Sequence, residues 1–283
     1  MNKIRHEIKE QYNDLTQSLK IVANFILDNP ELVALYPAKE IGRLSETSET
    51  TVIRLSHALG YSGYAALQEE IRKTLLLPDE EPFQALKKGM DIKENVLNYV
   101  VEQDMKFIKE TFEKISEAQF LEAVKSIIDA KKIVVAGLKG SYGPANWLAY
   151  SLNIVKGNTY LYKGDIEDAN YLLTDMTKDW LVIALSFQRY VEQTISFAKA
   201  SREKGAKILS ITDNELSPVG VLSDITFKVI TPNPTGLKGI PVIASVLNAL
   251  VSGVMVIDKK NVVARVDQYN QTSEHYYTFY RLN

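Results

Sequence analysis

The order of hydrophobic and polar positions divides the chain into a helical first part and an alternating second part. Residues 4 to about 77 carry apolar side chains at helical spacing, as at Val22 and Ile26. Thr16 suits the N-cap of that helix, and Pro30 predicts its end, because the residue before proline disfavours helical backbone angles. Further helices are predicted at 37–45, 49–59, 64–76, 96–114 and 117–130.

From residue 133 onward, short apolar runs alternate with amphipathic segments. The run at 133–136 lacks the polar alternation of a half-exposed strand, which favours a strand buried on both faces of a parallel sheet. The same pattern predicts strands at 158–162, 180–186, 207–212 and 225–230, with helices at 142–156, 166–176, 191–204, 216–222 and 240–258. Strands that alternate with helices imply a parallel α/β fold with right-handed crossovers.

Composition narrows the class of protein. Of the 283 residues, 46% are hydrophobic and 24% charged, which is typical of a globular chain with an ample core. We expect no membrane span, because we find no apolar run of about 18 residues in the sequence. We also expect no signal peptide, because the N-terminus lacks an apolar core. The chain has no cysteine and only three scattered histidines, so we expect no disulfide, thiol nucleophile or metal site, and no cofactor. The cytoplasm is the expected compartment.

Two short helices around residue 47 form a candidate helix-turn-helix. Ser48 suits the N-cap of the second helix, and Gly60 suits its C-terminal end. The outward side chains of that helix are short polar groups and cations, which suit phosphates and base edges: Ser48, Glu49, Thr50, Thr51, Arg54 and His57. A small helical bundle with a solvated face would give the same pattern. Residues 1–77 hold nine basic and ten acidic side chains, so DNA binding would rest on local clustering and dimerisation.

The segment 48–67, S-E-T-T-V-I-R-L-S-H-A-L-G-Y-S-G-Y-A-A-L, resembles the N-terminal domain of RpiR-family (MurR/RpiR) bacterial regulators. The upstream pattern from Leu15 to Pro30 is similar as well. The resemblance implies DNA binding and extends the candidate contacts to Tyr61 and Ser62. Glu46 stands where the turn of the family usually has glycine, so a positive φ there would strain the backbone.

A strand, a glycine-containing turn and a helix start meet at 137–141, the sequence G-L-K-G-S. Free main-chain N–H groups at such a turn suit an anion such as a phosphate, and the Ser141 hydroxyl adds a donor. The spacing differs from the dinucleotide-binding fingerprint. An ordinary strand-to-helix turn would read the same way.

Residues 107–250 are similar to a SIS (sugar isomerase) domain, a flavodoxin-like fold that binds phosphosugars in isomerases and in RpiR-type regulators. The matching motifs are G-x-x-G-S at 137–141, D-W-L-V-I-A-L-S at 179–186 and G-A-K-I-L-S-I-T-D-N…S-P at 205–218. Ligands of such folds lie at the carboxyl ends of the strands. We therefore expect the loops after Ala136 and Ser186 to lie side by side.

The second loop departs from the family pattern S-x-S-G-x-T. Ser186 is retained, but Gln188 replaces the second serine, Arg189 the glycine and Val191 the threonine. Arg189 either contacts an anion in bidentate fashion or is a surface charge. The resulting candidate ligand residues are Gly137, Lys139, Gly140, Ser141, Ser186, Gln188 and Arg189.

The sequence thus predicts an all-α helix-turn-helix domain (1–77), a linker (78–94) and an α/β flavodoxin-like SIS domain with a parallel sheet (95–283). We expect a DNA-binding transcriptional regulator, a homodimer or homotetramer, whose operator affinity responds to a small anionic metabolite. The alternatives are a sugar-phosphate isomerase or a SIS module that only dimerises. The segment 236–250, G-L-K-G-I-P-V-I-A-S-V-L-N-A-L, lacks the glutamate that SIS isomerases often carry there, and an isomerase needs a general base. The tyrosine-rich tail, 268–283, is expected to be an ordered strap over the domain or a binding element.

Overall fold

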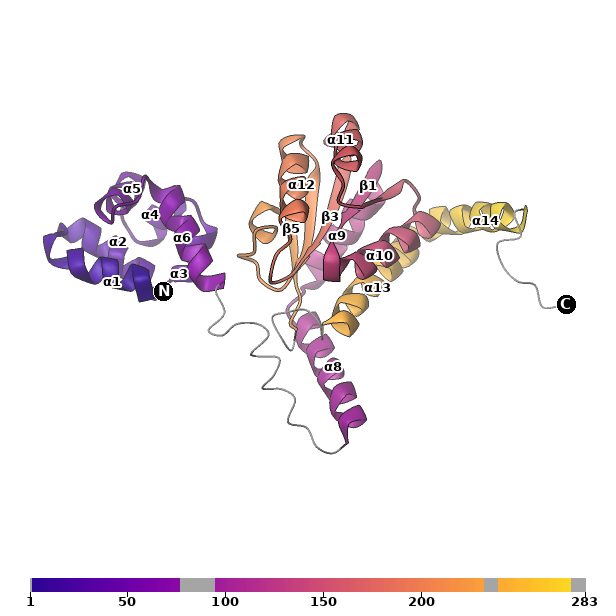
Figure 1. Ribbon diagram of the computed structural model, residues 1–283, viewed down its shortest axis with the longest axis horizontal. Coiled ribbons are helices and arrows are strands. Elements are labelled where there is room, and N and C mark those ends of the chain that lie inside the picture. The colour runs from indigo at the N-terminus through magenta and orange to yellow at the C-terminus, as the bar shows by residue number, and fades with distance from the viewer. Residues whose placement is uncertain (1, 77–94, 232–238, 276–283) are drawn as a thin grey trace. The chain divides into compact units, whose positions relative to one another are not determined.

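A computed structural model describes residues 2–76, 95–231 and 239–275 of the chain. Two compact units are present, Met1–Asp79 and Glu80–Asn283 (Figure 1). The predicted linker, 78–94, lies outside the described residues.

The first unit is all helix. An apolar face of each main helix meets the others in one core, which includes Ile8, Ile26, Ile41, Leu55 and Ile71, all fully buried. The helices are α1 (Asn2–Gln11), α2 (Gln17–Asp28), α3 (Pro30–Leu35), α4 (Ala38–Leu44), α5 (Glu49–Ala58) and α6 (Tyr64–Leu76), with a 3₁₀ turn at Tyr12–Asp14.

Local signals in the first unit were mostly read correctly. Ser48 caps α5, and Gly60 adopts a φ of +86° just after it. Thr16 occupies the N-cap position of α2, but its side chain makes no capping hydrogen bond, contrary to the prediction. Pro30 ends α2 as predicted and also begins α3, a helix that the sequence analysis missed, because proline is favoured at the first helical position.

The second unit is a five-stranded, all-parallel sheet with the order β2-β1-β3-β4-β5. This is the flavodoxin-like order, so the predicted fold class is confirmed. The strands are β1 (Lys132–Ala136), β2 (Thr159–Tyr162), β3 (Trp180–Ser186), β4 (Lys207–Thr212) and β5 (Ile225–Lys228). The helices are α8 (Val96–Phe112), α9 (Glu117–Asp129), α10 (Tyr142–Val155), α11 (Ile166–Asp175), α12 (Glu192–Glu203), α13 (Ile240–Ile257) and α14 (Lys259–His275).

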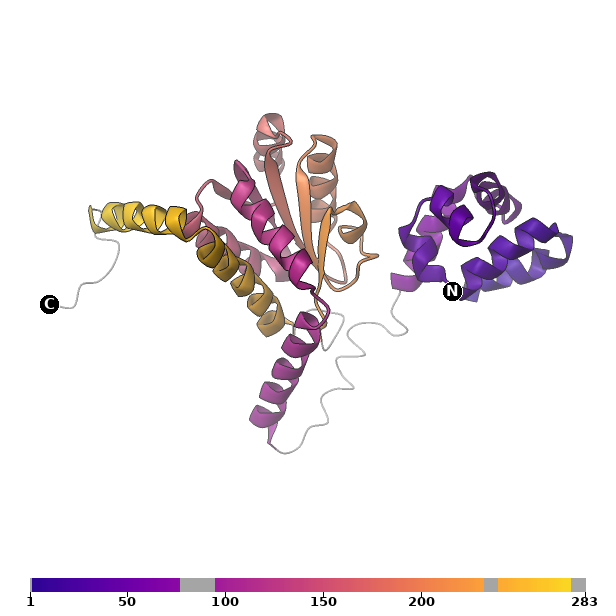
Figure 2. The ribbon, with the colours of Figure 1, turned by 180° about the vertical axis from the view of Figure 1, so that it is seen from behind.

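Helices cover both faces of this sheet (Figures 1 and 2). One core joins Ile133 and Ile183 to α9, α10 and α13, whereas the other joins Val134 and Val182 to α11 and α12. Neighbouring residues of one strand therefore enter opposite cores, which explains why the strands read as continuous apolar runs. On the second face the Tyr162 and Phe197 rings stack, with centroids 4.2 Å apart.

Two expectations for this unit need correction. The predicted helix at 216–222 is only a 3₁₀ turn, Gly220–Leu222, and the predicted strand at 225–230 ends at Lys228. The tail is helical as far as His275, because α14 continues after α13, and the rest of the tail lies outside the described residues. Within the described part, Arg265 of α14 donates hydrogen bonds to the Asn153 carbonyl of α10.

The expectation that no apolar run of about 18 residues occurs is wrong. Helix α13 has 18 residues and a mean hydropathy of 2.2, so by length and composition alone it is long enough to cross a membrane. Eight of its residues are buried in the domain. Val246 and Leu250 lie in the core beside the sheet.

Candidate functional site

Helices α4 and α5 form the helix-turn-helix. The Ser48 hydroxyl accepts a hydrogen bond from the main-chain N–H of Thr51, 3.1 Å away, and lies 2.8 Å from the Thr51 hydroxyl. Val52 and Leu55 on the inner side of α5 are fully buried. Packing of this inner side fixes which residues of α5 face outward.

Gly42 sets how closely α4 approaches α5. A Cβ atom at Gly42 would lie 2.8 Å from the Glu49 nitrogen and 2.9 Å from the Ser48 carbonyl carbon. Both neighbours are main-chain atoms, so they cannot swing aside. The following turn contains Glu46, whose φ of +55° lies in the left-handed region, as the glycine usual at this position of the family led us to expect. A non-glycine residue in this region costs roughly 1–2 kcal/mol.

The outward side of α5 carries the predicted DNA contacts. Ser48, Glu49, Thr50, Arg54 and His57 are exposed, and Thr51 is half-buried. Among the described residues Arg54 makes no hydrogen bond or ion pair, so its guanidinium is available to a ligand. His57 is partly engaged, since its Nδ1 lies 3.1 Å from the Tyr61 carbonyl oxygen.

The two predicted contacts after α5 differ in their surroundings. The Tyr61 hydroxyl donates a hydrogen bond to Glu7 Oε2, 2.7 Å away, and burial together with that carboxylate raises the pKa of Tyr61. Tyr61 therefore ties the end of α5 to α1. Ser62 is exposed in the next turn. Lys39 and Arg43 of α4, which the sequence analysis left out, are exposed cations on the helix that crosses the DNA backbone in this motif.

The turn between β1 and α10 contains the first set of predicted ligand residues. Gly137 is buried, and a Cβ atom there would lie 3.0 Å from Ala145 Cβ and 3.1 Å from Leu185 Cβ, so the close approach of α10 requires glycine. Lys139 and Gly140 are exposed, and Lys139 has a φ of +53°. Ser141 is half-buried at the start of α10.

This turn offers fewer main-chain donors than predicted. The Ser141 N–H donates to the Leu138 carbonyl oxygen at 3.1 Å, and the Tyr142 N–H donates to the Lys139 carbonyl oxygen. Pro144, in the first turn of α10, has no N–H to offer. The Ser141 hydroxyl and the Lys139 ammonium group therefore become the main groups that an anion would meet.

The loop between β3 and α12 lies beside that turn, as predicted. Strands β1 and β3 are paired, with Ala136 opposite Ala184. Ser186 ends β3 with a side chain only 3% exposed, and its hydroxyl has no hydrogen-bond partner among the described residues. Arg189 is exposed and has a φ of +70°, which explains why related loops favour glycine there.

Asp213 lies across the second loop and was missed as a site residue. Strand β4 pairs Thr212 with Ser186, so Asp213 follows directly at the same edge of the sheet. Its Oδ2 atom accepts a hydrogen bond from the Gln188 N–H, 3.2 Å away, and the carboxylate also accepts one from the Tyr190 hydroxyl. Burial raises the pKa of Asp213 although these bonds lower it, and burial beside Asp213 raises the pKa of Tyr190.

Thr194 is a second residue that the sequence analysis missed. It lies in the first turn of α12, is 1% exposed, and its hydroxyl has no partner among the described residues. A buried hydroxyl without a partner costs about 1–3 kcal/mol, so such groups are expected to meet a ligand or water.

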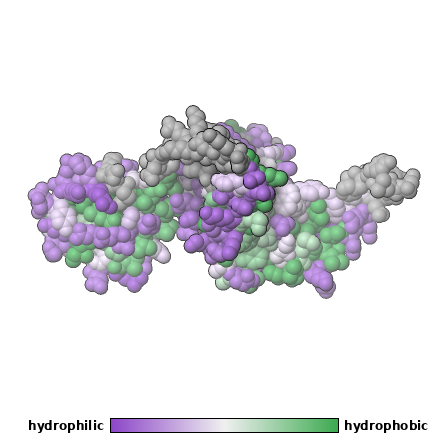
Figure 3. All heavy atoms as spheres, turned by 90° about the horizontal axis from the view of Figure 1, so that it is seen from below, coloured by the Kyte–Doolittle hydropathy of each residue, from purple (hydrophilic) through white to green (hydrophobic). Residues whose placement is uncertain are grey.

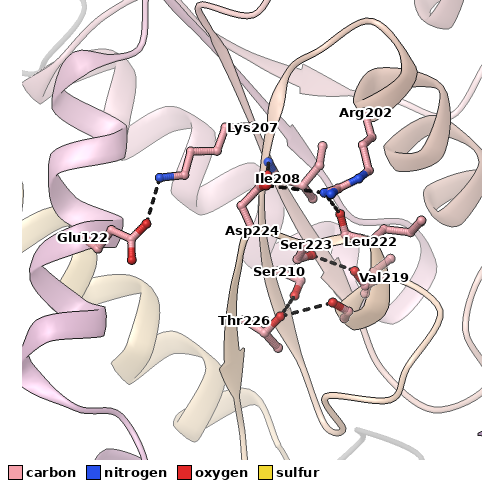
Figure 4. A network of polar contacts seen from close by, with 11 residues as sticks. Glu122, Arg202, Lys207, Ile208, Ser210, Val219, Leu222, Ser223, Asp224 and Thr226 are labelled. Carbon is pink, nitrogen blue, oxygen red and sulfur yellow. Dashed lines mark hydrogen bonds and ion pairs between the residues drawn. The ribbon is translucent and has the colours of Figure 1, made fainter. Parts of the chain in front are cut away.

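The opposite edge of the sheet carries a charged groove of about 480 Å³. It lies at the amino ends of β1, β3 and β4, far along each strand from Ser141 and Ser186. Lys207 contacts Glu122 at 3.0 Å, and Arg202 bonds the Leu222 carbonyl and Asp224 nearby (Figure 4). Lys131 pairs with Asp179. These cations are paired and solvent-exposed, so we regard the groove as structural. The described residues include no cluster of three or more metal-ligating side chains.

Family comparisons fit both units. Residues 2–76 match the helix-turn-helix domain of the rpiR family, and residues 126–253 match the SIS domain. The chain belongs to the RpiR family. It is a transcriptional regulator with a helix-turn-helix domain and a SIS domain, so the predicted family is confirmed.

Several regulators and solved structures are similar to this chain. The Bacillus subtilis HTH-type transcriptional regulator YbbH is 21% identical over 94% of this chain and 92% of its own. The Pseudomonas aeruginosa regulator HexR is 22% identical over 84% of this chain and 82% of its own. The structure of Vibrio vulnificus NanR complexed with ManNAc-6P covers 95% of this RpiR-family chain and 97% of its own, with a TM-score of 0.58 and 18% identity. The sugar isomerase domain of an RpiR transcription factor from Sphaerobacter thermophilus has a TM-score of 0.59 at 20% identity, over 63% of this chain and 99% of its own.

Proposed function

We propose that this regulator binds operator DNA through α5 and that a small anionic metabolite, bound at the carboxyl ends of β1 and β3, changes its operator affinity. The observation that carries the DNA-binding half is the outward side of α5. Arg54 stands there exposed and has no hydrogen-bond or ion-pair partner in the described part of the chain, while the inner side of the helix is packed. An arginine in the major groove either pairs with guanine or contacts phosphate.

A gel-shift or anisotropy assay with the DNA upstream of its own gene tests this half. We expect Arg54→Ala to weaken binding by roughly 1–3 kcal/mol if it reads a base, or to lower the salt slope by about one if it contacts phosphate. Lys73→Ala, another exposed cation in the same unit, is the matched control. Equal losses in both variants, or no loss in either, would contradict the assignment.

The metabolite half rests on Ser141, Lys139 and Ser186. Their groups come from two paired strands and two helix starts, and each helix start adds about half a positive charge. NanR, which has a similar fold, was solved with a sugar phosphate. A ligand that binds one arrangement of a dimer better than another would shift the spacing of the two α5 helices and so the operator affinity.

We further propose that the chain is no isomerase. Helix α13 contains no carboxylate, and Asp213, a half-buried carboxylate at the site, already accepts hydrogen bonds from the Gln188 N–H and the Tyr190 hydroxyl. A general base needs a lone pair directed at the substrate proton. Enzyme assays with sugar phosphates as substrates test this part. Conversion that is lost in Ser141→Ala would contradict this part.

A homodimer is the assembly that we propose, with the cytoplasm as its compartment. Helix α8 exposes an apolar stripe at helical spacing: Leu97, Val101 and Met105 are 76%, 47% and 65% exposed. Val256 and Ile257 at the end of α13 are exposed as well. Figure 3 shows apolar residues gathered over parts of the surface rather than scattered singly. Apolar areas of this kind commonly mark protein contacts.

A further inference from the structure

Asp213 places a carboxylate where the β3–α12 loop would otherwise receive an anion. The Gln188 N–H, one of the main-chain donors of this loop, points at Asp213 Oδ2. The Tyr190 hydroxyl donates to the same carboxylate, and the Thr212 hydroxyl lies 3.2 Å from its Oδ1. Both oxygens of Asp213 are thus held by the loop and by the end of β4.

We infer that Asp213 acts as an internal anion of the β3–α12 loop and excludes the anionic group of a ligand from it. This inference rests on the proposed metabolite site and makes Asp213 a specificity-determining residue of that site. A main-chain N–H has one hydrogen to donate, and that of Gln188 is already used. A second anion at the same place would also meet the negative charge of Asp213 in a partly buried environment, where like charges repel strongly.

The neighbouring side chains define what else a ligand would meet at this loop. Position 188 carries an amide and position 191 an apolar valine, so the loop lacks two hydroxyl donors of the family pattern, whereas Arg189 remains as an exposed cation. Ser186 is only 3% exposed, and its hydroxyl has no hydrogen-bond partner among the described residues. The Thr194 hydroxyl in the first turn of α12 likewise has no partner among the described residues. A hydroxyl both donates and accepts, so these two groups can complement the hydroxyls or the amine of a neutral or cationic ligand end.

The class of effector follows from these contacts. Its anionic end belongs at the β1–α10 turn, beside Lys139 and Ser141. The end that reaches the β3–α12 loop carries hydrogen-bond donors, such as sugar hydroxyls or an amine, because Asp213 accepts and cannot donate while ionised. A molecule with a second anionic group at that end would be rejected.

Titration with inorganic phosphate, without DNA, tests the role of Asp213. Asp213→Asn keeps the size of the side chain and an acceptor oxygen but removes the charge. We expect it to bind phosphate at least about 10-fold more tightly than the wild type, as removal of a nearby like charge allows. Glu215→Gln removes the same charge from an exposed position two residues away and should change phosphate affinity less than about 2-fold.

Equal or weaker phosphate binding by Asp213→Asn would overturn the inference. If circular dichroism shows that this variant is unfolded, Asp213→Ser takes its place. The ¹⁵N-labelled wild type gives an independent answer: phosphate should shift the amide signals of Gly140 and Ser141 and leave that of Gln188 in place. A phosphate-dependent shift of Gln188 in the wild type would also overturn it. Neither result depends on operator binding, so failure here leaves the DNA-binding proposal to its own test.

Discussion

The Gln188 N–H donates a hydrogen bond to the carboxylate of Asp213, 3.2 Å away, although 25 positions separate the two residues in the chain. The bond joins the loop after β3 to the end of β4 at the edge of the sheet where the ligand site is expected. It also fixes a negative charge in a largely buried place, and that charge has a measurable consequence for stability.

We expect Asp213 to make the SIS domain less stable as the pH rises. Burial raises its pKa in the folded state, so the folded chain holds this proton more tightly than the unfolded chain. The protonated carboxyl of Asp213 therefore stabilises the folded chain fully when the pH is below the pKa of this group in the unfolded chain. This stabilisation is lost as the pH rises through its pKa in the folded chain. Tyr190, the titratable side chain bonded to Asp213, stays neutral throughout because its own pKa is raised.

Thermal unfolding of wild type and Asp213→Asn between pH 4 and 8 measures this effect. The melting temperature of the wild type should fall relative to that of Asp213→Asn as the pH rises, and the difference should then level off. A difference that stays constant over the range would mean that the carboxyl titrates alike in both states.

Gly42→Ala should destabilise the helix-turn-helix domain. The new methyl group would lie within 3 Å of main-chain atoms of Ser48 and Glu49, so α4 and α5 would have to separate. Overpacking of this kind costs typically about 1–3 kcal/mol. Chemical denaturation, followed by the helical signal of the first unit, gives the value. Arg43→Ala, at the exposed neighbouring position, is the control and should change stability by less than about 0.5 kcal/mol.

Charged substitutions on α8 should disrupt self-association. We expect Leu97→Glu combined with Met105→Glu to convert the dimer into a monomer, because burial of an unpaired carboxylate in an apolar interface is strongly unfavourable. Light scattering after size-exclusion chromatography would show the change in mass. The matched control is Glu102→Gln with Lys106→Gln on the same helix, which leaves the apolar stripe intact. A double-glutamate variant that keeps the wild-type mass would place the interface elsewhere.

The sequence predicted the fold where a local pattern decides the structure. Strands β3 and β4 were placed with their correct ends, because both are continuous apolar runs bounded by polar residues. Helix α14 was missed, because Lys259 to His275 is polar and lacks the apolar periodicity that marks a packed helix. The resemblance to RpiR regulators predicted which two domains the chain contains, whereas the periodicity of apolar residues predicted only helices and strands.

The candidate site could be predicted only in part. Ser141 and Ser186 follow predicted strands, so the topology placed them at one edge of the sheet. Asp213 and Thr194 carry no local signal of their role. Asp213 matters because its carboxylate accepts a hydrogen bond from a loop 25 positions away in the chain. Thr194 matters because its buried hydroxyl has no hydrogen-bond partner among the residues that the structure describes. Both facts depend on tertiary packing.

Operator affinity measured by fluorescence anisotropy with a panel of phosphorylated and carboxylated metabolites tests the central claim most directly. At least one metabolite should change the operator affinity of the wild type by about 5–150-fold, the usual range of coupling between two sites. Ser141→Ala should bind operator like the wild type and lose most of that response. An operator affinity that no metabolite changes, or a response that Ser141→Ala retains in full, would contradict the account.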